Sequence, residues 1–481
     1  MIEDQIYGWH TFYMTYRNCV CLTSNNKQGA RGSMSSRSGL DRVLNLPPFW
    51  LAFAFVALVS LPMSYVAMPI AAAPLGALPA IAVIVIVTFI MCLSTSAIAE
   101  AVVALPEEKR PHNLRDLVVA YLGIRIGNIT AVAIGVVFFA VLVACLVSMA
   151  STLSFYTGMS EEMWLAVVSV LILVVISVGN VAHSLSMIAG AAALTIIIAI
   201  LIGLIPFVNL DRFLFAQVPF TDNRGAAPEL WSGFLGVSIL SFIGPLLLVP
   251  SATYVLPNNP NAEQYIRGSL WGIVFQGVLM VLWISLVEMS VLPAELIGLH
   301  GTVFLKLGEE TDGFIKTAGT ILVFILPGLA AIRSAAQLGV VIRLFLKPSQ
   351  TPSSSVASFA WKYLVPAIPT LAAIALVAIL IEENEANVAA FLSVGGILGS
   401  SIATGIVPSL MYQRLTQLVG DPVVPALQLF RRSSTLIGSS VFFSVVLLSY
   451  GTLVWHSLPI QILACVIAGA NLFYVYYTMR R

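Results

Sequence analysis

The sequence predicts an all-α membrane protein of about twelve transmembrane helices, arranged as two five-helix repeats of opposite orientation followed by two further helices. Of its 481 residues, 59% are apolar and 9% are charged, whereas an ordinary soluble domain has about 25% charged residues. The mean hydropathy is +0.97. A soluble fold cannot hold so much apolar surface because its outer shell faces water, but a membrane protein can expose it to lipid.

Twelve apolar stretches are long enough to cross a bilayer, since about 30 Å of hydrocarbon requires about 20 residues of helix. We place them at residues 49–75, 78–104, 127–156, 163–180, 184–208, 231–256, 267–292, 315–345, 362–382, 387–412, 434–456 and 459–478. The third and eighth are long enough to be strongly tilted. Residues 1–46 are polar and rich in Ser, Asn, Gly and Arg, which predicts a disordered tail.

The distribution of Lys and Arg predicts the orientation of these spans. With the N-terminus in the cytoplasm, 18 of the 23 basic residues lie on the inner side. The outer segments are acidic instead, at residues 161–162, 309–312 and 382–385. Because basic residues favour cytoplasmic loops, we expect an integral, multi-pass protein with both termini in the cytoplasm.

Spans 1–5 and 6–10 correspond to one another. Spans that start near residues 49, 78, 127 and 184 are matched by spans that start near 231, 267, 315 and 387. Because five is an odd number, the two halves enter the membrane in opposite senses and form an inverted repeat. We therefore divide the chain into a cytoplasmic tail (1–46), a first repeat (47–210), a second repeat (228–415) and two additional helices (430–481).

The first helix of each repeat is interrupted at a corresponding place. Proline removes a backbone donor and glycine lets the chain leave helical geometry. In hydrocarbon such breaks are tolerated where buried protein, ions or solute supply partners. One kink alone occurs in many helices that bind nothing, but a matched pair predicts a substrate site. The residues of this predicted site are Pro62, Met63 and Ser64 in span 1 and Phe242, Ile243 and Gly244 in span 6.

Several short segments resemble the amino acid–polyamine–organocation transporter superfamily, which has a leucine-transporter-like fold of five-plus-five inverted repeats. They are residues 64–69 (SYVAMP) with 73–76 (APLG), residues 97–100 (AIAE) and residues 256–260 (LPNNP). The resemblance extends over about residues 47–479. It implies a secondary active transporter that moves amino acids or a related small organic solute by alternating access. A polyamine or nucleobase cargo, or a sensor that binds solute without moving it, are the alternatives.

The break in span 1 departs from that superfamily. Members that bind amino acids usually have a glycine-rich run there, whose amides hold the substrate carboxylate, whereas this sequence has Pro62, Met63 and Ser64. Related metal-ion transporters carry DPGN and MPHN at their two breaks. Neither motif occurs here, so we do not expect a divalent metal cargo.

Arg333 is a charged residue inside predicted span 8. It precedes Arg343 by ten residues, which places it roughly 15 Å from the inner interface. A central Arg costs about 2.5–3.5 kcal/mol on insertion scales, so it should face the bundle interior. In sodium-coupled relatives this part of span 8 binds sodium, so the resemblance implies that Arg333 replaces the sodium charge. It could instead pair with a substrate carboxylate, or cap helix carbonyls.

Other residues are weaker candidates for binding, coupling or gating. Phe138 in span 3 and Ser393 in span 10 are expected to line the solute site, and Phe242 to cover it. Ser334, Glu288 and Glu100 are expected to act in coupling or gating, with a buried carboxyl as a proton carrier. The alternative for both carboxyls is an interfacial role. The small residues at 395–400 are expected to permit close helix packing.

The sequence does not favour an enzyme. Its five His residues lie outside the centres of the spans, and it has no HExxH, GxSxG or Walker A motif. We expect no cofactor, no metal site and no nucleic acid partner. The expected partners are the lipid bilayer and a small organic solute, with proton coupling and a homodimer left open.

Overall fold

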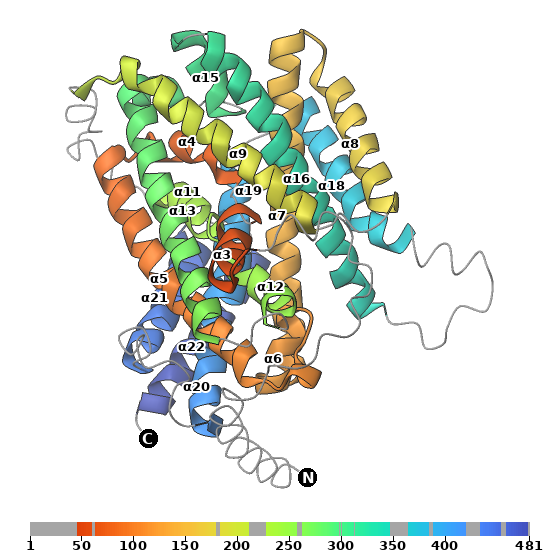
Figure 1. The fold of residues 1–481 in the computed structure, drawn as a ribbon, viewed down its shortest axis with the longest axis vertical. Helices are drawn as coiled ribbons and strands as arrows, with labels where there is room; N and C mark the ends of the chain where they lie inside the picture. The colour runs from red at the N-terminus through yellow and green to blue at the C-terminus, as the bar shows by residue number, and fades with distance from the viewer. Residues whose placement is uncertain are drawn as a thin grey trace, which may run out of the picture.

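The structure is a computed structural model. It describes residues 46–59, 63–178, 183–210, 228–256, 262–297, 299, 301–311, 313–346, 364–383, 388–419, 433–453 and 458–479. Within these ranges the protein is an all-α bundle (Figure 1), which confirms the predicted fold class. Eight helical stretches of the described chain are long and apolar enough to cross a membrane, and three shorter apolar helices accompany them.

Helices occupy all twelve predicted positions. The unbroken spans are α5 (Ala77–Ala104), α7 (Ile124–Thr157), α8 (Glu161–Val178), α9 (His183–Leu204), α13 (Ala262–Ser290), α16 (Gly313–Phe345), α18 (Val365–Glu382), α21 (Ser433–Leu453) and α22 (Leu458–Met479). As predicted, α7 and α16 are the longest, with 34 and 33 residues.

Spans 1 and 6 are broken, as the sequence predicts. Span 1 consists of α3 (Pro48–Ala54), the π-helical turn η2 (Phe55–Val59), the 3₁₀ turn η3 (Met63–Val66) and α4 (Met68–Ala72). Span 6 consists of α11 (Pro228–Leu240), the 3₁₀ turn η6 (Gly244–Leu247) and α12 (Leu248–Val255). The two breaks adjoin, because η2 packs against η6, and α3 lies near the middle of the bundle in Figure 1.

Span 10 differs from a regular helix. It begins as α19 (Val388–Val394), continues for twelve residues as the π-helix η8 (Gly395–Ile406) and ends as α20 (Val407–Val419). π-Helix is rare, occurs mostly as single turns within α-helices, and is frequently found at functional sites. The sequence predicts the span but gives no sign of its wider turns.

The segment between spans 2 and 3 contains a helix. This helix, α6 (Leu114–Leu122), begins after Asn113, whose side-chain oxygen accepts a 2.9 Å hydrogen bond from the Asp116 amide. Such N-caps satisfy one of the free amides of the first turn. Figure 1 shows α6 and α20 at one end of the bundle and α15 (Val303–Glu310) at the other.

Candidate functional site

A pocket lies where five spans meet beside the two breaks. Eleven of its thirteen lining residues are apolar, and the two with polar side chains are adjacent on α16. The lining consists of Leu58 and Val59 from η2, Phe138 and Val141 from α7, Leu240, Ile243 and Leu247 from span 6, Leu326, Leu329, Ala330, Arg333 and Ser334 from α16, and Leu392 from α19.

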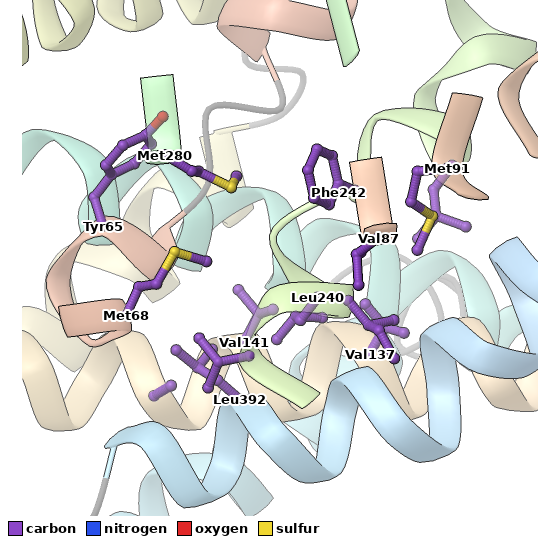
Figure 2. Packing of buried hydrophobic residues seen from close by; sticks show 14 of the residues in the cluster. Tyr65, Met68, Val87, Met91, Val137, Val141, Leu240, Phe242, Met280 and Leu392 are labelled. Carbon is purple, nitrogen blue, oxygen red and sulfur yellow. The ribbon is translucent and has the colours of Figure 1, made fainter. Parts of the chain in front are cut away.

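Four of the predicted site residues line this pocket: Phe138, Ile243, Arg333 and Ser334. Phe242 is fully buried but is not part of the lining. In the view of Figure 2 its ring lies nearer to Val87 of α5 than to Val141 or Leu392. At the break in span 6, the side chains of successive residues point in different directions. Ile243 therefore faces the pocket, whereas Phe242 does not.

Of the other predicted residues, two lie next to lining residues in the chain and two lie on helices that do not line the pocket. Gly244 is buried at the start of η6, and Ser393 is buried next to the lining residue Leu392. Glu100 and Glu288 are buried elsewhere in α5 and α13.

Three of the predicted site residues belong to the span 1 break. Pro62 lies outside the described residues, and the side chains of Met63 and Ser64 are likewise not described.

The lining residues that sequence reasoning missed are ordinary aliphatic side chains. Val141, Leu240 and Leu392 line the pocket from three different spans, and Figure 2 labels all three within the buried hydrophobic cluster. Each lies in an apolar run, so neither its type nor its spacing distinguishes it from a core residue.

Glycine residues set the distance between span 10 and its neighbours. A Cβ atom on Gly395 would lie 2.7 Å from the Ala140 Cβ, and one on Gly396 would lie 2.7 Å from the Gly236 carbonyl carbon. On Gly399 it would lie 2.7 Å from the Ala133 carbonyl oxygen. Real Cβ atoms do not approach so closely, so these contacts confirm the predicted packing role of residues 395–400. They bring α7, α11 and span 10 together around the pocket.

Three buried side chains of α13 bind the backbone of the broken spans. The Gln276 Nε2 donates to the Val56 carbonyl at 3.0 Å, inside the π-helical turn of span 1. The Trp283 Nε1 donates to the Tyr65 carbonyl at 2.9 Å, beyond the break. The third bond lies in span 6, where the Tyr265 hydroxyl donates to the Leu248 carbonyl at 2.6 Å.

These α13 donors supply partners for backbone groups near the breaks, as a bilayer interior requires. Spacings of eleven and seven residues put Tyr265, Gln276 and Trp283 on one helical face. That spacing is the sequence signal by which they could have been found.

A group of buried aromatic rings lies between the span 1 break and α15. The rings of Tyr65 and Trp283 have centroids 6.0 Å apart, and those of Trp283 and Phe304 are 5.6 Å apart. All three side chains are at most 1% exposed. The Tyr156 hydroxyl donates to the Phe304 carbonyl at 3.0 Å and fixes α15 against α7. These contacts join η3, α13, α15 and α7.

Arg333 is the charged residue of the pocket lining. Its Nη2 atom is buried and has no hydrogen-bond partner among the described residues. Ion pairs do occur in the described ranges, between Arg115 and Asp116, Arg267 and Glu263, and Lys306 and Glu309. Over the same ranges no group of three or more His, Cys, Asp or Glu side chains could hold a metal ion.

Comparison with known proteins identifies a related family. Residues 51–299 match the model of the tryptophan/tyrosine permease family, which is just over half of the 481 residues. No curated protein matches the sequence.

Solved structures of a manganese transporter share the fold. The crystal structure of the Eremococcus coleocola manganese transporter with an aromatic bis-isothiourea substituted compound has a TM-score of 0.55 and 13% sequence identity, over 95% of this chain and 98% of that one. Two mutants of the same transporter each have a TM-score of 0.56 and 13% identity, over 94% of this chain and 96% of theirs. At this identity the likeness shows a common fold alone.

Proposed function

Because the chain belongs to the tryptophan/tyrosine permease family, we propose that it carries amino acids with aromatic or other large apolar side chains across a membrane by alternating access. The coarser conclusion, that it is a membrane transporter and not an enzyme, follows from the family and the fold. Membership of the amino acid–polyamine–organocation superfamily is part of the proposal.

The observation that carries this proposal is the composition of the pocket at the breaks. Its wall is apolar except at Arg333 and Ser334, a pattern typical of small-molecule sites in which a few polar groups fix the orientation of the ligand. An indole or phenol ring would pack against Phe138, Val141 and Leu392. The half-helices of spans 1 and 6 end beside the pocket, where their dipoles and backbone groups can bind the charged part of a solute.

The hydrogen bonds of α13 support a movement in which the broken spans act as one unit. Gln276 and Trp283 bind span 1, and Tyr265 binds span 6. We infer that spans 1, 2, 6 and 7 rotate together against spans 3, 4, 8 and 9. This movement would separate Trp283 of α13 from Phe304 of α15, whose ring centroids are 5.6 Å apart.

Two further features bear on the driving ion. Arg333 places a fixed positive charge in the pocket that η2 also lines, which disfavours a sodium ion there by like-charge repulsion. Glu288 is 2% exposed, and its Oε1 has no hydrogen-bond partner among the described residues. We therefore expect sodium-independent transport, with Glu288 as the proton carrier if protons drive it.

The test is uptake by proteoliposomes that contain the purified protein. Tryptophan, tyrosine and phenylalanine are compared with putrescine, adenine and Mn²⁺, each with sodium and with choline in its place. Accumulation of the aromatic amino acids without sodium is the expected result. Transport of one of the other cargo classes in their place would refute the proposed substrate, and strong sodium dependence would refute the expected role of Arg333.

A pair of variants tests whether this pocket is the transport site. Leu392→Trp fills the pocket from α19 and should abolish uptake. Phe473→Trp enlarges a side chain that is 70% exposed on α22 and should leave uptake unchanged. Equal uptake by the two variants, with both folded by size-exclusion chromatography, would exclude the pocket.

A further inference from the structure

Arg333 carries a positive charge whose counter-ion does not come from the described residues. It lines the pocket, and the other described lining residues include no acidic side chain. Its buried Nη2 makes no hydrogen bond to the described part of the chain. Removing a charge from water without a partner is unfavourable. A ligand that supplies a negatively charged partner for the guanidinium would therefore bind more tightly than one that does not.

The geometry of the guanidinium group selects the kind of ligand. It is planar, always charged, and presents several N–H donors in a fixed arrangement that matches the two oxygens of a carboxylate. A ligand with an amine and no acid would instead bring a second positive charge to the same wall. A neutral nucleobase would leave the guanidinium uncompensated.

We propose that Arg333 binds the carboxylate of the transported solute, so that the site recognises monocarboxylates with an apolar body. The inference rests on the proposed function, because it assigns one end of the same substrate. The carboxylate would lie against α16 at Arg333, and the side chain would extend toward Val141, Leu240 and Leu392. In this site a side chain therefore performs the anion recognition for which the span 1 break has no glycine.

Three indole compounds separate the two ends of the substrate. Tryptophan has a carboxylate and an ammonium, 3-indolepropionate has the carboxylate alone, and tryptamine has the ammonium alone. Binding of each to purified full-length protein is measured by thermal shift and by competition with radiolabelled tryptophan. Wild-type protein should bind tryptophan and 3-indolepropionate at least tenfold more tightly than tryptamine.

Variants of Arg333 should change this preference. Arg333→Gln should weaken tryptophan and 3-indolepropionate at least tenfold, and should leave tryptamine unchanged or tighter. Arg333→Lys retains the charge without the paired donors and should weaken binding less than Arg333→Gln does. If Arg333→Gln does not fold, Arg333→Lys serves as the test variant. Arg343→Gln is the control, because it removes a charge from the same helix outside the pocket lining.

The outcomes distinguish this inference from the proposed function. If Arg333→Gln binds all three compounds with the wild-type ratios, Arg333 has a structural role and the inference is wrong. If wild-type protein prefers tryptamine, the inference is also wrong, although the pocket still binds indole compounds. If wild-type protein binds none of them, the proposed function itself fails and the inference fails with it.

Discussion

The contact between span 6 and span 10 offers a sharp test of how the pocket is built. Gly236 of α11 faces Ser393 of α19, and a Cβ atom on Gly236 would lie 2.6 Å from both the Ser393 Cα and its carbonyl oxygen. The first distance is about 0.8 Å shorter than the 3.4 Å at which ordinary contact begins. Because the obstructing atoms are backbone, Gly236→Ala must separate the two helices.

The expected cost follows from two opposing effects. Overpacking a closely packed interior costs about 1–3 kcal/mol, whereas replacing a helical glycine by alanine without strain gains about 0.4–1 kcal/mol. We therefore expect Gly236→Ala to destabilise the protein by about 1–2 kcal/mol. Transport should fall as well, since Leu240 and Leu392 line the pocket from the two helices that are pushed apart.

A neighbouring glycine provides the matched control. Gly233 lies three residues earlier on α11, and a Cβ atom there would meet nothing within 4 Å. Gly233→Ala should therefore keep or raise the melting temperature and leave uptake unchanged. Both variants are compared by thermal unfolding in detergent and by uptake in proteoliposomes. A melting temperature for Gly236→Ala at or above that of Gly233→Ala would show that the two helices do not touch as described.

Three further predictions concern buried polar side chains of the bundle. Gln276→Leu removes the hydrogen bond to span 1. It should lower the maximal rate of uptake and change the KM little, since Gln276 contacts a broken span and does not line the pocket. An unchanged maximal rate would contradict this prediction. Glu288→Gln should abolish stimulation of uptake by an inward proton gradient while substrate counterflow continues, and retained stimulation would exclude Glu288 as the proton carrier. Asn471→Leu removes hydrogen bonds of 2.6 and 2.8 Å to Ser444 and Ser440 of α21. Because hydrogen bonds between membrane helices contribute about 0.6 kcal/mol on average, this variant should lower the melting temperature and leave the KM unchanged. A change in KM would place α22 in the transport path.

The two breaks were predictable because their cause is local. Pro62 and Pro245 interrupt apolar runs, and proline disrupts a helix wherever it stands in the interior. Arg333 was also recognisable, since a charge amid Leu and Ala in a membrane helix requires an interior position. The glycines at 395–399 predicted close packing for a similar reason, because the absence of a side chain is visible in the sequence itself.

The assignment of individual residues to the pocket was not predictable to the same extent. Phe242 and Ile243 are neighbours in an irregular turn, and the sequence favoured the aromatic residue as the one that covers the solute. The structure puts Ile243 on the pocket and buries Phe242 outside the lining. No helical period applies at a break, so the direction of each side chain depends on what packs against it.

The sequence by itself determined that the chain is a bundle of membrane helices with two interrupted spans and one intramembrane arginine. The effects of hydropathy, proline and an isolated charge depend on the local sequence and on the surrounding solvent, so they can be predicted without the tertiary structure. The tertiary structure alone decided which side chains form the pocket, that α13 binds both broken spans, and that span 10 is π-helical. These features depend on contacts between residues far apart in the chain, such as Gln276 and Val56, which are 220 positions apart. Contacts of that range are set by how all the helices pack together. The spacing of Tyr265, Gln276 and Trp283 shows that they share one face of α13, but it does not show which backbone groups they bind.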